Sequence, residues 1–233
     1  MIFDPVYWIL IIGIMAMMGL ASKNVQSTFK KYSEVPIRVR MTGAQAARQI
    51  LDRNGLQNIQ VERVQGELTD HYDPQGKVLR LSQPVYDSAS VSAVGVAAHE
   101  AGHALQDKSN YFPLRFRQGF YPLASIGSNL GMMLVFFGLI GTMILGQFGT
   151  LIALAGLGLY ACAVFFTIIT LPVEFNASSR AMQCLQSYGI VTSEEYSNTQ
   201  KVLNAAAMTY VAAAVGAVLT LLYWAMLIMG QNE

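Results

Sequence analysis

Two histidines four residues apart, with a glutamate directly after the first, occupy the segment His99–His103, which reads HEAGH. On a helix, residues i and i+4 share one face, so both imidazoles can reach one metal ion while Glu100 lies beside it. Two neutral imidazoles and one further protein ligand then hold Zn²⁺, and a water in the open position has its pKa lowered toward about 7. We expect Glu100 to accept that water's proton as general base, which is the chemistry of zinc hydrolases.

The third ligand must be a carboxylate, because no histidine follows His103. A metzincin would place a histidine six residues further on, where this chain has Ser109. The downstream carboxylates are Asp107, Glu174, Glu194, Glu195 and Glu233. Asp107 lies one turn along the same helix and would approach the ion from the same side as the imidazoles. Glu194 and Glu195 are explained by a capping box that begins at Thr192.

Glu174 has no comparable alternative explanation. It is the first charged residue after the uncharged stretch Gln118–Val173. An uncharged stretch of this length can cross a membrane, and ionisable groups at or near the depth of a membrane span are often functional. We therefore predict Glu174 as the third zinc ligand, and the alternative is a carboxylate that only marks the membrane interface.

The composition indicates a membrane protein. Hydrophobic residues make up 53% of the 233 residues and charged residues only 12%, whereas a soluble domain has about 25% charged residues. The apolar runs are long enough for about four spans, and a polar break at 146–150 divides the longest run. We predict spans near residues 5–21, 121–145, 151–171 and 206–229.

The basic residues predict the orientation. All 15 Lys and Arg residues fall within 22–117 and 174–204, so the positive-inside rule places both segments in the cytosol of a multi-pass plasma-membrane protein. Both chain ends then face outward. The net charge of +1 gives no nucleic-acid-binding signature, and the two cysteines support no disulfide framework.

The fold predicted is an α-helical multi-pass membrane protein with a small α+β cytosolic domain. Thr42 and Gln45 form a capping box for a helix over 43–54, which Gly55 can close. Alternating patterns predict half-buried strands over 58–62 and 77–81, with a turn at 73–76 between them. Ser88 or Ser90 can cap the helix that carries the HEAGH segment to about residue 107.

The predicted organisation has five parts along the chain. They are a first span at 1–21, a cytosolic metalloprotease domain at 22–117, two spans at 118–173, a cytosolic segment with the third ligand at 174–204, and a last span with the tail at 205–233.

HEAGH, together with Leu171–Ala181, which reads LPVEFNASSRA, resembles the YugP-type neutral zinc metallopeptidases of bacterial membranes. The segments Asp70–Pro74 and Val78–Ser82 resemble that family too, so the likeness covers nearly the whole chain. More distantly, the chain is similar to HtpX-type membrane proteases, in which an aspartate four residues after the ligand glutamate supports the metal site. This chain has Ser178 there. The resemblance implies a zincin-like domain and a gluzincin-like peptidase.

Four further polar residues are candidates for supporting roles. Ser178 or Asn176 could hydrogen-bond a metal-bound histidine. Arg180 could orient Glu174 or the substrate, or lie on a solvated helix face. His71 could stabilise the oxyanion of an attacked amide, although a residue beside a turn and satisfied locally is the favoured interpretation.

Together these features predict a membrane-bound zinc endopeptidase that acts on membrane or juxtamembrane proteins, with the lipid bilayer as its environment. The strand near 78–81 is expected to pair with the substrate backbone. The alternative is a non-catalytic membrane scaffold or pseudoprotease with structural or lost zinc, which would need ligands but no base. The sequence leaves open whether the chain binds a second copy of itself or another membrane partner.

Overall fold

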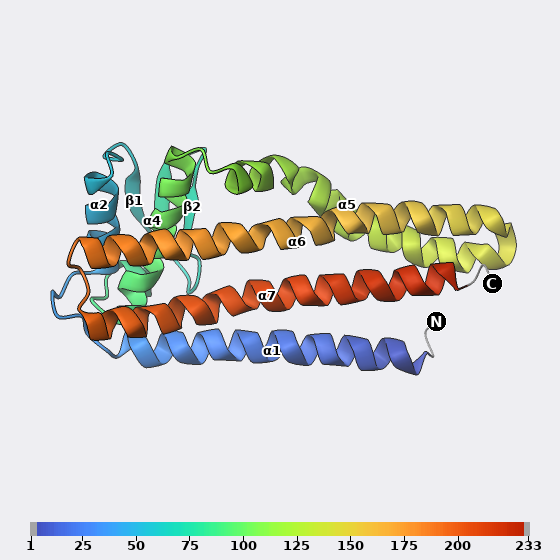
Figure 1. Ribbon diagram of the computed structural model, residues 1–233, viewed down its shortest axis with the longest axis horizontal. Helices are drawn as coiled ribbons and strands as arrows, with labels where there is room; N and C mark the ends of the chain where they lie inside the picture. The colour runs from blue at the N-terminus through green and yellow to red at the C-terminus, as the bar shows by residue number, and fades with distance from the viewer. Residues whose placement is uncertain (1–3, 231–233) are drawn as a thin grey trace. The chain divides into compact units, whose positions relative to one another are not determined.

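The computed structural model describes residues 4–230, so Glu233 and the extreme ends of the first and last predicted parts lie outside the described residues. The chain divides into two compact units (Figure 1). Unit 1 comprises residues 1–20, 115–171 and 210–233, and unit 2 comprises residues 21–114 and 172–209.

Four helices among residues 4–230 are long and apolar enough to cross a membrane: α1 (Pro5–Ser33), α5 (Phe112–Leu145), α6 (Gln147–Ser187) and α7 (Ser193–Met229). This confirms the predicted number of apolar helices. Each helix continues beyond its predicted span. The polar break between the second and third spans is reduced to Gly146, whose φ of +54° suits a residue without a Cβ atom.

Unit 1 is held together by close helix contacts. A Cβ atom on Gly138 would lie 2.4 Å from the backbone nitrogen of Ala153, so α5 and α6 approach each other at backbone distance. Small residues at such positions allow the close packing that is typical of membrane helices. At the start of α1, Asp4 accepts a hydrogen bond from the Tyr223 hydroxyl of α7 at 2.8 Å.

Unit 2 combines helices with a small sheet, as predicted. Its first helix, α2 (Gly43–Arg53), has the predicted capping box, in which the backbone nitrogen atoms and side chains of Thr42 and Gln45 bond reciprocally. Gly55 follows the helix with a φ of +69°. The sheet has the strand order β1 (Gln60–Val64), β3 (Val78–Ser82) and β2 (His71–Asp73).

The sheet corrects three expectations. The first strand begins at residue 60 rather than 58, because Arg48 binds the carbonyl oxygens of Leu56 and Ile59 and holds that segment in a turn. A short strand, β2, precedes the predicted turn and pairs antiparallel with β3, whereas β1 pairs parallel with it. Because β3 is central and almost fully buried rather than half-buried, it cannot take up a substrate strand; only an edge strand can.

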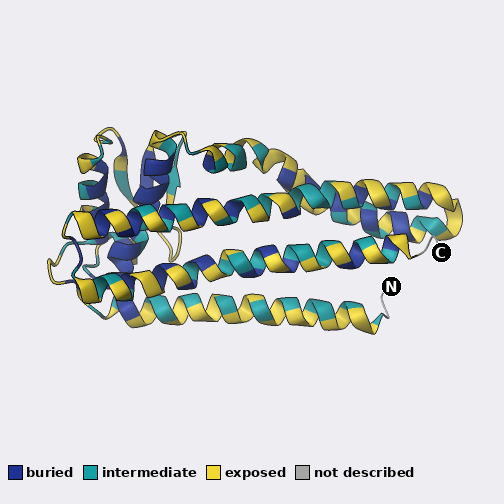
Figure 2. Cartoon of the chain, in the orientation of Figure 1, coloured by how far each residue is buried: buried dark blue, intermediate teal, exposed yellow. Residues whose placement is uncertain are grey.

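The HEAGH helix, α4 (Val91–Lys108), lies in the core of unit 2 and is mostly buried (Figure 2). Ser90 is its N-cap, and the Ser90 hydroxyl accepts a hydrogen bond from the backbone nitrogen of Ala93. A short helix that the sequence patterns did not indicate, α3 (Gln83–Tyr86), links β3 to α4. The small residues of α4 allow neighbouring elements to approach its backbone closely.

Candidate metal centre

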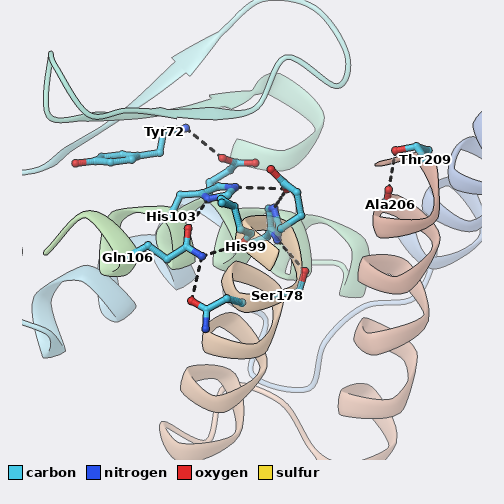
Figure 3. Close-up of polar contacts among 11 residues, drawn as sticks. Tyr72, His99, His103, Gln106, Ser178, Ala206 and Thr209 are labelled. Atoms are coloured by element: carbon cyan, nitrogen blue, oxygen red, sulfur yellow. Dashed lines mark hydrogen bonds and ion pairs between the residues drawn. The ribbon is translucent and has the colours of Figure 1, made fainter. Parts of the chain in front are cut away.

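The structure brings His99, His103 and Glu174 together inside unit 2 (Figure 3). One potential ligand atom from each residue lies within 4.8 Å of the other two. The Glu174 Oε2 atom lies 3.2 Å from the Nε2 atom of His99 and 3.6 Å from that of His103. Residues from α4 and α6, 71 or more positions apart in the sequence, thus form one cluster.

Two carboxylates, Glu100 and Glu174, lie close to the buried imidazole of His103. Glu174 is only 3% exposed and His103 is 9% exposed. Burial by itself lowers the pKa of His103, but the hydrogen bond that Glu174 accepts from it and the charges of Glu100 and Glu174 outweigh burial and raise the pKa above its ordinary value. A buried carboxylate beside two imidazoles is an environment that a bound cation would stabilise.

The donor set fits zinc. Two imidazoles and one carboxylate are a known ligand combination of catalytic zinc, which keeps one position open for water or substrate. Each Nδ1 atom has another partner, at 3.0 Å in both cases: the Ser178 hydroxyl for His99 and the Gln106 amide oxygen for His103. The Nε2 atoms of both rings are therefore directed toward Glu174 and are available to bind the metal.

The structure distinguishes the two proposed supports for the histidines. Ser178 contacts His99 directly. Asn176 is linked to His103 through Gln106. The Oδ1 atom of Asn176 accepts a hydrogen bond from Gln106 at 3.0 Å, and Gln106 in turn contacts His103.

Gln106 is a residue of this site that sequence reasoning missed. It is completely buried, and it lies three positions after His103 on the same face of α4. Its amide nitrogen also donates to the carbonyl oxygen of Val173, next to Glu174, at 2.7 Å. The sequence feature that could have identified Gln106 is its position three residues after a predicted metal ligand, on the same helix face.

Glu100 lies beside the cluster and is held by the sheet. Its Oε2 atom accepts a hydrogen bond from the backbone nitrogen of Tyr72, at 3.1 Å (Figure 3). Tyr72 belongs to the edge strand β2, which is only three residues long and has no clear alternating pattern. Sequence reasoning missed Tyr72 for that reason.

Asp107 lies outside the metal cluster. Its Oδ2 atom accepts hydrogen bonds from the Tyr72 hydroxyl at 2.7 Å and from Lys77 at 2.6 Å. Burial and the hydrogen bond to Asp107 raise the pKa of the Tyr72 phenol, so this hydroxyl stays protonated.

Glu195 lies in the capping box predicted at the start of α7, where its side chain accepts a hydrogen bond from the backbone nitrogen of Thr192.

His71 and Arg180 are not members of the metal cluster. His71 is exposed, and its Nδ1 atom lies 2.8 Å from the carbonyl oxygen of Thr69. Arg180 donates to Asn176 at 2.8 Å and lies over the ring of Tyr111, 5.8 Å from its centre. The observed contacts of Arg180 connect it to the site through Asn176.

Gly102 allows the two ligand-bearing helices to meet. A Cβ atom at this position would lie 2.4 Å from the carbonyl oxygen of Ala177 on α6. We expect Gly102→Ala to destabilise the protein by about 1–3 kcal/mol, because a backbone clash cannot be relieved by a rotamer change. Thermal unfolding in detergent measures this effect. The matched control is Gly158→Ala, where no atom lies within 4 Å of the added methyl group; equal stability losses in both variants would contradict the explanation.

Two histidines and a glutamate on packed helices thus form a group that could hold zinc, with a second glutamate beside it. Residues 7–229 match the family model described as putative neutral zinc metallopeptidase. The chain is 47% identical over 216 residues to the Bacillus subtilis (strain 168) protein named putative membrane protease YugP, and the match covers 91% of this chain and 92% of that relative. No solved structure matches the chain. The chain belongs to this neutral zinc metallopeptidase family, which confirms the resemblance seen in the sequence.

Proposed function

We propose that this protein is a membrane-bound, gluzincin-like zinc endopeptidase. The observation that carries the proposal is the convergence of His99, His103 and Glu174 next to Glu100, which a purely structural zinc site would not require. When bound, zinc lowers the pKa of a water molecule and polarises the carbonyl group of the peptide.

Residues of the chain transfer the proton and orient the metal ligands. Glu100 takes up the proton of the attacking water and can deliver it to the leaving nitrogen. The backbone nitrogen of Tyr72 holds one oxygen of this carboxylate, so proton transfer falls to the other oxygen. Ser178 and Gln106 orient the rings of the two histidines.

The edge strand β2 is the proposed support for the substrate backbone. It is paired with β3 on one side, and its Tyr72 backbone nitrogen contacts Glu100. An extended peptide beside β2 would therefore pass next to the base. β-Augmentation of this kind uses the main-chain groups of an exposed sheet edge.

The proposed substrates are membrane proteins or their juxtamembrane segments. Glu174 follows the uncharged stretch that ends at Val173, so the site is expected to lie close to the bilayer surface. The test of the proposal is zinc-dependent cleavage of an unfolded model substrate by the purified protein, compared with the Glu100→Gln variant. Zinc binding without any cleavage would instead favour a non-catalytic scaffold.

We also propose that the site faces the cytosol. Single cysteines at Ser109 and Gln147, in a background without Cys162 and Cys184, report the orientation through impermeant thiol reagents on intact cells. Both positions are exposed, whereas the neighbouring Gly149 is packed against the backbone of Gly141 and would not accept a side chain. We expect Gln147→Cys to react and Ser109→Cys to be protected until the membrane is opened, because basic residues concentrate around Ser109. The reverse pattern would place the site outside the cell.

A further inference from the structure

A series of side-chain hydrogen bonds runs from Arg180 on α6 to His103 on α4. Figure 3 shows its last two members, Gln106 and His103. The Nε atom of Arg180 donates to the Oδ1 atom of Asn176 at 2.8 Å. The same Oδ1 atom accepts a hydrogen bond from the Nε2 atom of Gln106 at 3.0 Å. The Oε1 atom of Gln106 lies 3.0 Å from the Nδ1 atom of His103. We call this series of hydrogen bonds, from Arg180 through Asn176 and Gln106 to His103, the amide relay.

The orientation of each amide in the relay follows from its partners. A guanidinium group only donates hydrogen bonds, so Asn176 must direct its oxygen toward Arg180. That oxygen and the carbonyl oxygen of Val173 both face the Gln106 amide, and both are acceptors. The nitrogen of Gln106 must point at them, because two oxygens facing each other without a proton would be repulsive. The oxygen of Gln106 is then left to face His103.

This orientation determines which ring nitrogen of His103 carries the proton. An amide oxygen only accepts, so the Nδ1 atom of His103 must be the donor in this contact. The Nε2 atom, which faces Glu174, is then the ring nitrogen that can give up its proton and bind zinc. We propose that the amide relay fixes the metal-binding tautomer of His103, with Arg180, Asn176 and Gln106 as positioning residues.

The other histidine has no such constraint. The partner of His99 is the hydroxyl of Ser178, which can donate or accept a hydrogen bond. Ser178 orients the ring of His99 but does not select its tautomer. The relay therefore requires a proton on the Nδ1 atom of His103, whereas the partner of His99 sets no such requirement, and this inference rests on the proposed zinc site.

The consequence is a graded effect on zinc binding. Gln106→Met keeps the size of the side chain but removes the acceptor, and we expect zinc affinity to fall by about 10- to 100-fold. Asn176→Leu should cost less, because Val173 still orients Gln106, and Arg180→Met should cost least. Asn176→Asp retains an acceptor for both neighbours and should behave nearly as wild type. Affinity is measured by competition with a chelator in detergent.

The tautomer itself can be observed directly. The chain has only three histidines, so ¹⁵N-histidine labelling gives a simple long-range ¹H–¹⁵N spectrum of the full-length protein, recorded with and without zinc. We expect the Nδ1 atom of His103 to carry a proton in wild type and in Asn176→Asp, with and without zinc. A mixture of both tautomers is expected in Gln106→Met and, to a smaller extent, in Asn176→Leu.

Two results would overturn the relay. One is an unchanged tautomer and unchanged zinc affinity in Gln106→Met and Asn176→Leu; the other is an equal loss in Gln186→Met, an exposed glutamine on α6 that serves as the matched control. A purely structural role would lower thermal stability without moving the ring proton. If Gln106→Met does not fold, Asn176→Leu and Asn176→Asp still test the relay. Failure of wild type to bind zinc would refute the proposed function, while the zinc-free spectrum would still show whether the Nδ1 atom of His103 is protonated.

Discussion

Replacing Glu100 by glutamine is expected to lower the rate of peptide cleavage by about 100-fold or more while the protein keeps its zinc. Glutamine has the same size as glutamate but cannot accept the proton of the attacking water. Its amide can still accept the hydrogen bond from the backbone nitrogen of Tyr72 through the side-chain oxygen, so the surrounding geometry should be preserved. Single-turnover cleavage of a model substrate, together with metal analysis of the same sample, measures both quantities.

The matched control is Glu194→Gln, which makes the same change at an exposed position in the first turn of α7. This variant should cleave at the wild-type rate. Cleavage by Glu100→Gln at the wild-type rate would mean that Glu100 is not the base, and the proposed mechanism would be wrong.

Removal of the Glu174 side chain is expected to lower zinc affinity by more than about 100-fold. The loss of a direct ligand should exceed the loss of a residue that only supports a ligand, which typically costs 10- to 100-fold. The Glu174→Ala variant also leaves His99 and His103 without the carboxylate that lies beside both rings. Zinc content after dialysis and chelator competition give the affinity.

The control for this prediction is Glu194→Ala, which removes an exposed carboxylate outside the metal cluster. It should retain about one zinc per chain. Full zinc occupancy in Glu174→Ala would show that another residue is the third ligand, and the proposed assignment would have to be abandoned.

Local sequence patterns predicted a large part of this structure. The spacing of His99 and His103 determines that both rings share a helix face, because the α-helical period is a backbone property. The capping boxes at Thr42 and Thr192 could also be predicted from the sequence, because each involves residues only three positions apart. Four long apolar helices followed from the lengths and positions of the apolar runs, because runs of this length are rare in soluble domains.

The prediction of Glu174 as the third ligand joined residues that are far apart in the sequence. Its selection as the third ligand used elimination and its place after an uncharged stretch, and the structure places it beside both histidines. No local pattern could give the distances, because they depend on how α6 packs against α4. Gly102 is decisive here: the absence of a side chain lets the backbone of α6 approach that of α4.

Sequence patterns therefore predicted the local features: helix faces, caps, long apolar helices and the types of residues that can hold zinc. The pairing of β1 with β3, the contact of Tyr72 with Glu100, and the burial of Gln106 between His103 and Val173 are visible only in the folded chain. Helical periodicity and capping act over a few residues, whereas strand order and buried hydrogen bonds join residues far apart in the chain. Those long-range contacts depend on shape and packing that no short pattern encodes.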